Sequence, residues 1–331
     1  MEEILPRLYR IVVPLPQNPL KEINSYIFTS DDRNLIVDTG MNRIECSEVL
    51  EAGLAEIGVD LERTDFIATH LHSDHQGLIP TLKRAGSAAY MGELDAVQMA
   101  SGSEFGSSRS PMGTYARRSG FPADELEASL RDHPGYRYGP GADVDYIPLR
   151  GDEEFKVGDY TLVAVATPGH TYGHMCLYEP HKKMLLSGDH VLGDITPNIQ
   201  AWSDDQDPLA QYVESLEQVT KLEVELCLPG HRSLIRDFPG RVAELIEHHR
   251  LRANEVLDVL EGGGQKDAYQ TASEMSWRIR ARSWADFPVM QKWFAVGEAI
   301  AHLRYLEGHG LVDREERDGQ IFYSTDGGRR L

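Results

Sequence analysis

Short runs of apolar residues alternate along the chain with longer segments in which apolar residues recur every three or four positions. The short runs are bounded by Pro, Asn, Asp and Gly and are typical of strands, whereas the longer segments are typical of amphipathic helices. Strands are predicted at residues 9–13, 25–29, 35–38, 65–69, 155–157, 160–166, 175–178, 183–187 and 225–228. Helices are predicted at residues 43–57, 76–85, 111–118, 123–130, 208–219 and 240–260. Strands interleaved with helices on this scale indicate an α/β domain.

Residues 101–141 have a different composition, with many Gly, Ser, Pro and Arg residues. A segment of this length inside an α/β domain is more typical of a lid or an insertion than of a linker. A surface elaboration with no part in the chemistry is the alternative. Tyr115, Arg117 and Arg118 would suit an anionic substrate group such as CoA or a carboxylate, and a solvated helix face explains the same residues equally well.

Three consecutive glycines at residues 262–264 mark the clearest boundary in the chain, because such a run cannot sustain a helix. Helical patterns follow at residues 271–275 and 289–306, and a strand-like run follows at residues 321–324. A helix followed by a small β-hairpin is the outline of a winged helix. We therefore expect one large domain over residues 1–264 and a small winged-helix-like domain over residues 265–331.

The chain is strongly acidic, since its 331 residues include 33 Lys and Arg against 53 Asp and Glu, for a formal net charge of −20. Residues 268–331 hold nine basic and nine acidic residues and are neutral. A protein that binds nucleic-acid phosphates needs an excess of basic residues, so we expect no nucleic-acid partner. The C-terminal segment is then interpreted as a packing or dimerisation module, which leaves a homodimer open.

Targeting signals and disulfides are not expected. No apolar stretch approaches the roughly 18 residues of a membrane span, and the start of the chain lacks the basic and apolar regions of a signal peptide. Cys46, Cys176 and Cys227 are an odd number of cysteines in a long chain, which argues against a disulfide framework. We expect a cytoplasmic, reduced protein without a membrane partner.

One segment, Thr69-His70-Leu71-His72-Ser73-Asp74-His75, dominates the candidate chemistry. It follows an apolar strand directly. His70 and His72 are two residues apart, so in extended backbone they point the same way and can bind one ion. Asp74 and His75 follow where the chain turns toward the next helix, which directs them to a second position. Imidazole and carboxylate are ligands suited to zinc and other borderline transition metals.

Three further segments repeat the order of apolar strand, tight turn and ligand type. They end in Pro-Gly-His at His170, in Ser-Gly-Asp at Asp189 and in Pro-Gly-His at His231. In open α/β sheets, ligands collect at the carboxyl ends of strands, and all four segments deliver their polar residues there. The seven candidate ligands, His70, His72, Asp74, His75, His170, Asp189 and His231, are enough for two divalent metal ions. We expect zinc, with iron or manganese as alternatives.

The motif His-Leu-His-Ser-Asp-His, with the later Pro-Gly-His, Gly-Asp-His and Pro-Gly-His, resembles the metallo-β-lactamase superfamily over about residues 5–262. The resemblance implies an αββα sandwich that forms the catalytic domain. It also implies that His70, His72 and His170 bind one metal, that Asp74, His75 and His231 bind the other, and that Asp189 bridges them. Asp38-Thr39-Gly40 matches an early strand-end motif of the family, although a generic turn explains it too.

Differences from particular relatives narrow the function. Zinc β-lactamases lack a histidine at the position of His75, have a cysteine where Asp189 stands, and are exported. RNA-processing members usually carry a large inserted domain before the last ligands, for which the 41 residues between Asp189 and His231 leave no space. The C-terminal segment resembles the winged-helix-like tail of a branch with glyoxalase II-like and lactamase-like-protein-2-type enzymes. Glutathione-thioester hydrolases, however, usually have a basic helical tail, which the neutral tail here does not match.

Several other residues receive structural interpretations. His174 and His190 neighbour presumed ligands and are expected to hydrogen-bond to the site rather than to bind metal. His248 and His249 are predicted to be solvated on an exposed helix face. The remaining predictions are buried, inert thiols at Cys176 and Cys227, and packing of the tail against the main domain through Trp277, Trp284 and Trp293.

By the resemblance, the two metals share a water and lower its pKa toward about 7, and the resulting hydroxide attacks a carbonyl carbon. Asp74 would orient this nucleophile or pass a proton to the leaving group. The leading hypothesis is a hydrolase of thioesters, esters or lactones that acts on a small acyl substrate. The alternatives are an endoribonuclease or phosphodiesterase with the same two metals, a nucleic-acid-binding regulator with a relic metal site, and oxygen chemistry at a single iron.

Overall fold

The computed structural model describes residues 1–101, 110–133, 137–139 and 144–331, so parts of the predicted lid at residues 101–141 lie outside the described residues. The chain forms two compact units. The first contains residues 1–102, 137–197 and 215–242, and the second contains residues 103–136, 198–214 and 243–331. The division of the chain at Gly264 into a catalytic and a C-terminal domain stays a prediction.

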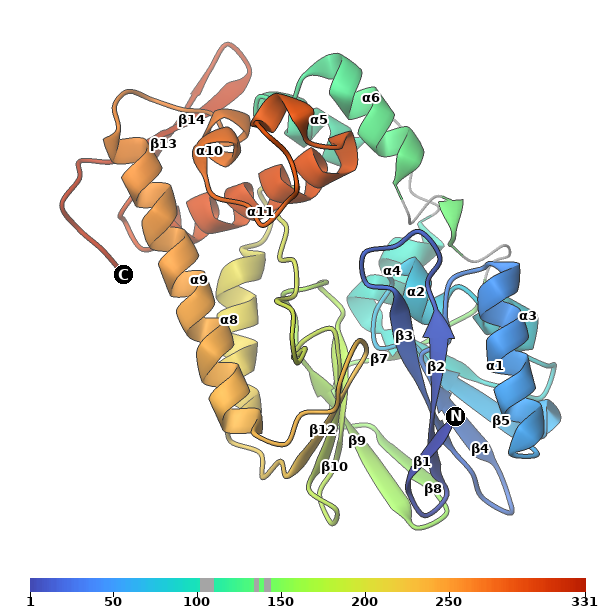
Figure 1. Cartoon of the computed structure of the whole chain (residues 1–331). Coiled ribbons are helices and arrows are strands. Elements are labelled where there is room, and N and C mark those ends of the chain that lie inside the picture. The colour runs from blue at the N-terminus through green and yellow to red at the C-terminus, as the bar shows by residue number, and fades with distance from the viewer. Residues whose placement is uncertain (102–109, 134–136, 140–143) are drawn as a thin grey trace. The chain divides into compact units, whose positions relative to one another are not determined.

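The first unit contains a mixed sheet whose strands follow one another in chain order (Figure 1). Its strands are β1 (Glu2–Leu5), β2 (Leu8–Pro14), β3 (Glu22–Phe28), β4 (Asn34–Val37), β5 (Thr64–Ile67), β6 (Ala89–Gly92) and β7 (Ile147–Leu149). The pairs from β1 to β4 are antiparallel, and the pairs from β4 to β7 are parallel. The carboxyl ends of β4, β5 and β6 therefore lie at one edge of the sheet.

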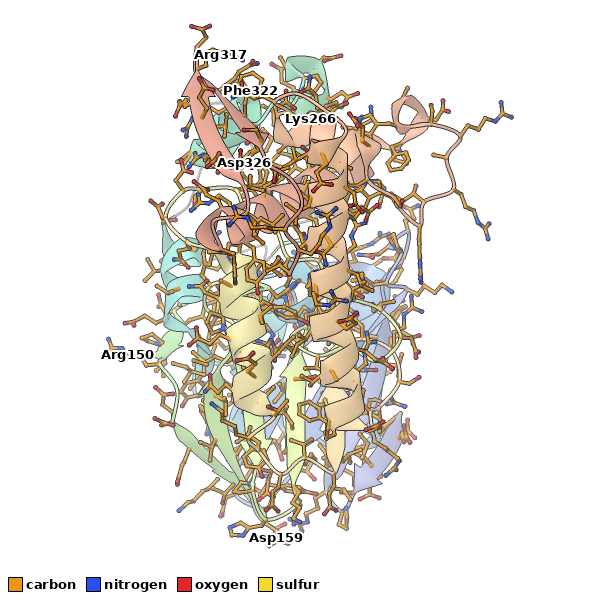
Figure 2. The ribbon with its side chains drawn as sticks, turned by 90° about the vertical axis from the view of Figure 1, so that its left-hand side faces the viewer. Arg150, Asp159, Lys266, Arg317, Phe322 and Asp326 are labelled. Atoms are coloured by element: carbon orange, nitrogen blue, oxygen red, sulfur yellow. The ribbon has the colours of Figure 1, made fainter. Side chains whose placement is uncertain are left out.

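A second sheet of the same unit has the order β12-β11-β10-β9-β8. Its strands are β8 (Glu154–Val157), β9 (Tyr160–Ala166), β10 (Met175–Glu179), β11 (Met184–Gly188) and β12 (Leu226–Pro229). All its pairs are antiparallel except β11 with β12, which is parallel. β8 and β9 form a hairpin in which Val157 pairs with Tyr160, so that the two-residue turn contains Asp159 (Figure 2).

Helices lie between and beside these strands. In the first unit they are α1 (Ile44–Glu56), α2 (Ser73–Gln76), α3 (Ile79–Leu82) and α4 (Glu93–Ala100), with a 3-10 turn at Leu61–Arg63. α8 (Pro208–Val219) ends in this unit and α9 (Phe238–Glu261) begins in it. Leu216, Val219 and Phe238 from these two helices are buried, and Ser215 donates a hydrogen bond to the carbonyl of Pro168.

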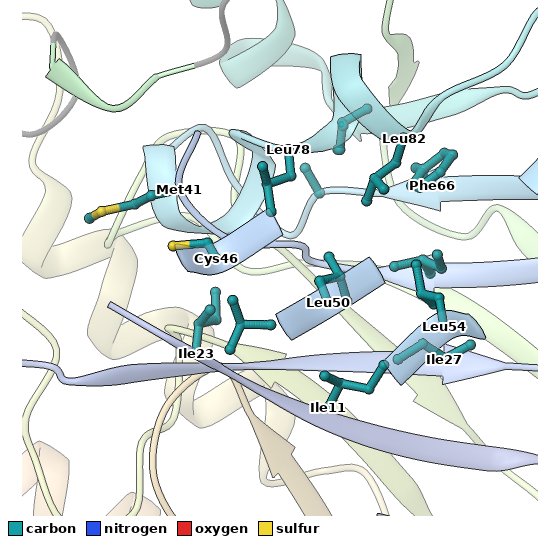
Figure 3. Close-up of a cluster of buried hydrophobic side chains, with 14 of the residues drawn as sticks. Ile11, Ile23, Ile27, Met41, Cys46, Leu50, Leu54, Phe66, Leu78 and Leu82 are labelled. Carbon is teal, nitrogen blue, oxygen red and sulfur yellow. The ribbon is translucent and has the colours of Figure 1, made fainter. Parts of the chain in front are cut away.

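Alternate residues along the strands of the first sheet pack in two different hydrophobic clusters, one on each face of the sheet. Ile36 of β4 belongs to a hydrophobic cluster with Leu50 and Leu54 of α1. Figure 3 shows the two leucines among other side chains of this cluster. Leu35 and Val37, which point to the other face, pack in a second cluster with residues of β8 to β12. One face of the sheet is therefore covered by helices and the other by the second sheet, which is the layering of an α/β sandwich.

The second unit has its own buried core. Its elements are α5 (Pro111–Arg118), α6 (Ala123–Asp132), α10 (Ala268–Glu274), a 3-10 turn (Trp284–Asp286), α11 (Val289–Gly308), β13 (Asp313–Arg317) and β14 (Gln320–Ser324), together with parts of α8 and α9. Trp293 of α11 stacks on Trp202 with a centroid distance of 3.9 Å and contacts Phe121 edge-on. β13 and β14 pair as an antiparallel hairpin on which the Arg317 guanidinium covers the Phe322 ring (Figure 2). Its winged-helix character stays a prediction.

The helix predicted at residues 76–85 is wrong, because two four-residue helices, α2 and α3, take its place. The chain changes direction at Gly77, which packs against other backbone so closely that a Cβ there would lie 2.5 Å from the Ser73 carbonyl oxygen and 2.7 Å from the Asn42 nitrogen. β1, β6, α4 and β7 were not predicted at all. The last three elements lie between residues 89 and 149, where apolar runs are very short.

The predicted solvation of His249 is also wrong. His249 is only 2% exposed, because its face of α9 is covered within the second unit. Its Nδ1 lies 3.2 Å from Nε2 of His302 on α11, and its ring contacts Tyr212 edge-on. His248, which lies one position away, is partly exposed.

Among the helices of the described part of the chain, none combines the length and the apolar character that crossing a bilayer requires.

Candidate metal centre

The seven predicted ligands all lie in the first unit, at the carboxyl ends of strands or just after them. Four follow β5 of the first sheet: His70 and His72 in the connecting turn, and Asp74 and His75 in α2. Three follow strands of the second sheet: His170 after β9, Asp189 after β11 and His231 after β12. The two sheets therefore bring their ligand types to a common place.

One group consists of three histidines. Nδ1 of His72 lies 2.8 Å from Nε2 of His70 and 3.0 Å from Nε2 of His170. Burial, reinforced by the neighbouring His170, lowers the pKa of His72 to about 3, and burial lowers the pKa of His70 as well. Neutral imidazoles present lone pairs, so three ring nitrogens converge on one point as the ligands of a transition metal do.

A second group consists of Asp74, His75 and His231, whose ligand atoms lie within 4.8 Å of one another. Nε2 of His231 lies 3.4 Å from Oδ2 of Asp74. Although burial opposes ionisation, the neighbouring imidazoles of His231 and His75 lower the pKa of Asp74 to about 2. The group therefore combines two imidazoles with one ionised carboxylate.

Asp189 lies between the two groups. Its Oδ1 is 3.5 Å from Nε2 of His75 and 3.5 Å from Nε2 of His231, while its Oδ2 is 3.5 Å from Nε2 of His170. Each oxygen of this carboxylate thus faces a different group of histidines. This is the arrangement expected of a carboxylate shared between two cations.

The donor set fits divalent metal ions. Three atoms of the site, Nε2 of His75, Oδ1 of Asp189 and Nε2 of His231, are buried and have no hydrogen-bond partner among the described residues. Buried polar atoms are mostly paired, so the convergence of three such atoms on one point favours a bound ligand there. Imidazole nitrogen and carboxylate oxygen suit zinc, iron or manganese.

The other ring nitrogens of these histidines are held by the surrounding backbone and side chains. Nδ1 of His231 donates to the carbonyl of Glu22 over 2.6 Å, and Nδ1 of His75 lies 2.8 Å from Oδ2 of Asp38. A neutral ring that donates through Nδ1 carries its lone pair on Nε2. Both rings are therefore oriented with Nε2 toward the site, which is the orientation that metal-binding histidines require.

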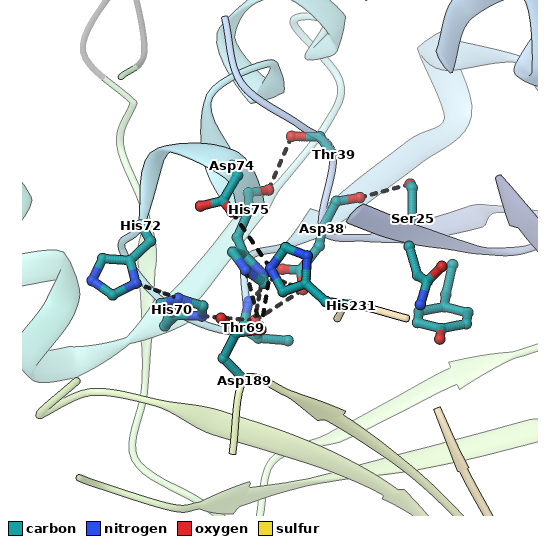
Figure 4. A network of polar contacts seen from close by, with 12 residues as sticks. Ser25, Asp38, Thr39, Thr69, His70, His72, Asp74, His75, Asp189 and His231 are labelled. Carbon is teal, nitrogen blue, oxygen red and sulfur yellow. Dashed lines mark hydrogen bonds and ion pairs between the residues drawn. The ribbon is translucent and has the colours of Figure 1, made fainter. Parts of the chain in front are cut away.

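Asp38 joins several parts of the site (Figure 4). It follows β4 and adopts a left-handed φ of 60°, which turns its carboxylate toward the end of β5. Oδ1 accepts the backbone N–H of Thr69, and Oδ2 accepts the Thr69 hydroxyl as well as facing His75. The sequence alone allowed Asp38-Thr39-Gly40 to be either a generic turn or a functional motif. In the structure, Asp38 of this motif directly contacts the candidate ligand His75.

Comparison with known proteins identifies the family. Residues 19–231, which contain all seven candidate ligands, match the model of the metallo-beta-lactamase superfamily. The chain belongs to this superfamily. Residues 284–326 match a second model, described as a metallo-beta-lactamase-like C-terminal domain.

Individual metallo-beta-lactamase relatives align over much of the chain. An atrochrysone carboxyl ACP thioesterase of Emericella nidulans is 26% identical over 261 residues, which cover 79% of this chain and 67% of that protein. The lactamase-like protein adaB of Aspergillus niger is 25% identical over 337 residues, which cover 91% of this chain and 90% of that protein.

Solved structures agree with this assignment. A metallo-beta-lactamase family protein from Thermus thermophilus is 27% identical with a TM-score of 0.81, and the match covers 97% of this chain and 99% of that one. A beta-lactamase domain protein from Burkholderia ambifaria is also 27% identical, with a TM-score of 0.83 and coverage of 98% and 94%. The predicted α/β metallo-β-lactamase fold is confirmed, whereas the particular branch stays a prediction.

His174, which precedes β10 of the second sheet, contacts the candidate metal centre. Its Nε2 accepts the backbone N–H of Asp189 over 3.2 Å, and its Nδ1 lies 2.8 Å from the Thr167 hydroxyl. The prediction that His174 hydrogen-bonds to the site is confirmed. His190 is fully buried, with its pKa lowered to about 3 by burial, and its part in the site stays a prediction.

Asp95 is a buried residue of the site that sequence reasoning missed. It lies in α4 and accepts three hydrogen bonds, from the backbone N–H of Leu71 (2.9 Å), the hydroxyl of Thr171 (2.7 Å) and the backbone N–H of Gly173 (2.8 Å). Leu71 lies between His70 and His72, and Thr171 follows His170. Asp95 therefore joins, through hydrogen bonds, the loop that contains His70 and His72 to the loop that contains His170.

Asp95 is fully buried in closely packed surroundings. Burial raises its pKa to about 6 despite the three hydrogen bonds. A Cβ at Gly173 would lie only 2.4 Å from the Asp95 backbone nitrogen, so this close approach requires glycine. In the sequence, Asp95 resembles any acidic residue in the first turn of a helix, and no pattern marks it as different.

Side chains of α5 that were considered for an anionic substrate group have other partners within the second unit. The Tyr115 hydroxyl is 3.1 Å from Oδ1 of Asp204, and Tyr115 is buried. Arg118 pairs with Asp204 at 3.3 Å and with Glu316 at 2.8 Å. These contacts give both residues a structural role in the described part of the unit.

Proposed function

We propose that the chain is a binuclear metal-dependent hydrolase that cleaves thioesters, with related esters and lactones as further carbonyl substrates. The observation that carries this proposal is the position of Asp189, whose two carboxylate oxygens face different groups of histidines at 3.5 Å. One metal ion would not require a carboxylate that faces both groups of histidines, whereas two adjacent metal ions would require one that can contact both of them.

The residues divide naturally between the two positions. His70, His72 and His170 would hold one ion, Asp74, His75 and His231 would hold the other, and Asp189 would contact both. Zinc is the ion we expect, with iron or manganese as alternatives at either position, because the ligands are imidazoles and carboxylates. When bound, the two ions supply a nucleophilic water that is ionised near neutral pH and positive charge that stabilises the oxyanion.

Residues of the chain complete the reaction in this proposal. Asp74 stays ionised, with its pKa near 2, so it can accept a hydrogen bond from the nucleophile and orient it. Asp38 and the Glu22 carbonyl keep His75 and His231 in the tautomer that offers Nε2. These fixed contacts mean that the site needs little reorganisation when substrate arrives.

A covalent mechanism through cysteine is not part of the proposal. Cys176 and Cys227 are fully buried, and burial raises the pKa of Cys227 to about 12. A thiol of this kind is protonated at neutral pH and inert. The same burial raises the pKa of Cys176.

Thioesters are the substrate class that we favour. Relatives named atrochrysone carboxyl ACP thioesterase support this choice. A thiolate leaves without strong acid assistance, so a site that offers carboxylates and neutral imidazoles is sufficient for this chemistry.

The test compares substrates at equal enzyme concentration and moderate salt. Protein depleted of metal with a chelator and reloaded with zinc should hydrolyse small acyl thioesters and lactones, and the depleted protein should not. An RNA strand and a phosphodiester probe serve as the competing substrates. Faster cleavage of RNA than of every carbonyl substrate, abolished by Asp189→Ala, would replace this proposal with the nuclease alternative.

A further inference from the structure

An exposed loop of the second unit carries three arginines at alternate positions, Arg278, Arg280 and Arg282. We call residues 278–282 the arginine loop. All three arginine side chains are exposed. Within the described residues, no carboxylate forms an ion pair with any of them, although many other arginines of the chain are paired.

The arginine loop is held firmly at both ends by tryptophans. On one side, the Trp277 indole N–H donates to the Ala272 carbonyl over 2.7 Å, and the Arg252 guanidinium lies 4.4 Å from the ring centroid. On the other side, Trp284 contacts the rings of Tyr269 and Phe287 at 5.4 and 5.0 Å. These contacts hold the residues on both sides of the arginine loop in place, while the three arginine side chains extend into solvent.

This concentration of positive charge is unusual for the chain, whose net charge is −20. Unpaired cations on an acidic protein create a local positive potential that attracts an anionic partner and orients it. The arginine loop also lies outside both segments that match family models, residues 19–231 and 284–326.

We propose that the arginine loop is the docking site for a small acidic protein that carries the acyl group as a thioester. The inference rests on the proposed thioesterase function and adds the identity of its substrate carrier. Relatives of the chain bear the name of acyl-carrier-protein thioesterases, which agrees with this class of partner.

The geometry of the loop favours a protein over other anions. A single phosphate or carboxylate binds best where buried polar groups surround it, whereas these three guanidinium groups are exposed and independent. A long nucleic acid would extend past the three arginines into the field of a chain whose net charge is −20, which repels a polyanion. A compact acidic surface of limited size matches three separated cations without that penalty.

The test reverses the three charges in the full-length, metal-loaded protein with the variant Arg278→Glu/Arg280→Glu/Arg282→Glu. The matched control, Lys156→Glu/Lys221→Glu/Arg236→Glu, makes the same change in net charge at exposed residues of the first unit. Binding of a fluorescently labelled holo acyl carrier protein is measured by anisotropy. Hydrolysis is measured with an octanoyl thioester on that carrier and with octanoyl-N-acetylcysteamine.

We expect the loop variant to raise the Kd for the carrier about tenfold and to raise the KM for the carrier-bound thioester to a similar extent. Hydrolysis of the N-acetylcysteamine thioester should stay within about twofold of wild type. The control variant should bind the carrier within about threefold of wild type, and higher salt should weaken wild-type binding.

Two outcomes would overturn the docking proposal. One is unchanged carrier binding in the loop variant. The other is tighter loop-dependent binding of duplex RNA or of phosphatidylglycerol vesicles than of the carrier. Failure of the thioesterase proposal is distinguishable, because wild-type protein would then leave octanoyl-N-acetylcysteamine intact while carrier binding is still measured.

Discussion

Oδ2 of Asp38 lies 2.8 Å from Nδ1 of His75, although the two residues are 37 positions apart in the sequence. The contact fixes which nitrogen of the imidazole faces Asp189 and His231. Because the same carboxylate also accepts two hydrogen bonds from Thr69, it holds both the ring and the turn that leads to His70. A residue outside the ligand set thus determines how one ligand is presented.

Replacing Asp38 with Asn should weaken metal binding without removing a ligand. The amide can turn its NH₂ toward His75, so the ring loses an acceptor that fixes its tautomer. We expect the affinity for the second zinc ion to fall about 10- to 100-fold. Competition with a chromophoric chelator measures it. Asp32→Asn, at an exposed position, is the control, and equal affinities in the two variants would contradict the role of Asp38.

Asp189→Ala tests the bridging carboxylate. Wild-type protein should contain two metal ions per chain by elemental analysis, and the variant should retain about one. Thioester hydrolysis should fall by about 100-fold or more, because no other carboxylate faces both groups of histidines. Circular dichroism should stay unchanged. Asp194→Ala removes an exposed carboxylate five residues away and should keep both ions, and full activity in the Asp189 variant would refute the ligand assignment.

Asp95→Ala should destabilise the fold of the first unit. Three buried donors would lose their acceptor, and each such loss costs about 1–3 kcal/mol when water does not replace it. We expect the free energy of unfolding in urea to fall by roughly 2–4 kcal/mol, with a loss of activity as the two loops move apart. Glu93→Ala, which removes an exposed ion pair from the same helix, should leave the free energy of unfolding almost unchanged. An equally small decrease in the free energy of unfolding for both variants would contradict the proposed role of Asp95 in joining the two loops.

The stability of the second unit should depend on pH through His249 and His302. His302 donates through Nδ1 to the Glu298 carbonyl at 2.8 Å, so its Nε2 accepts from His249 and both rings are neutral. Burial lowers the pKa of both, that of His302 to about 3, and Arg252 and His248 reinforce the shift. Because these folded-state pKa values lie below the unfolded value of about 6.5, the stabilisation is complete above pH 6.5 and is lost as the pH falls.

Each neutral histidine should contribute a slope of ~1.4 kcal/mol per pH unit below pH 6.5. Urea unfolding between pH 7.5 and 5 measures how the free energy of unfolding changes with pH. The variant His302→Gln keeps a hydrogen-bond donor and an acceptor, and it should lower this slope by the contribution of one histidine. The contributions of the metal-site histidines cancel in the difference between variant and wild type. Identical slopes for the two proteins would rule out the neutral pair.

Most of the candidate centre could be predicted from sequence because its signal is local. A strand, a tight turn and a metal-ligating residue type lie within a few positions of one another, and this order occurs four times. The strands β9 and β10 and the helix α8 were likewise predicted almost to the residue, since their apolar patterns are long enough to define a period.

The features that escaped prediction depend on contacts distant in sequence. Asp95 acts through Leu71 and Gly173, and nothing near it in the chain indicates those partners. The break at Gly77 follows from packing against Asn42 rather than from helix propensity. His249 is buried because α11 supplies His302, 53 residues later. In each case tertiary packing overrides a local pattern that is compatible with several environments.

The division of the ligands between the two sheets has a mechanical consequence. His75 follows a strand of the first sheet, while His170, Asp189 and His231 follow strands of the second. An ion held by ligands from both halves acts as a cross-link, so occupancy of the centre and cohesion of the sandwich are thermodynamically linked. Parting the sheets would release the ions, and withdrawing the ions would leave the sheets joined by apolar packing and hydrogen bonds alone.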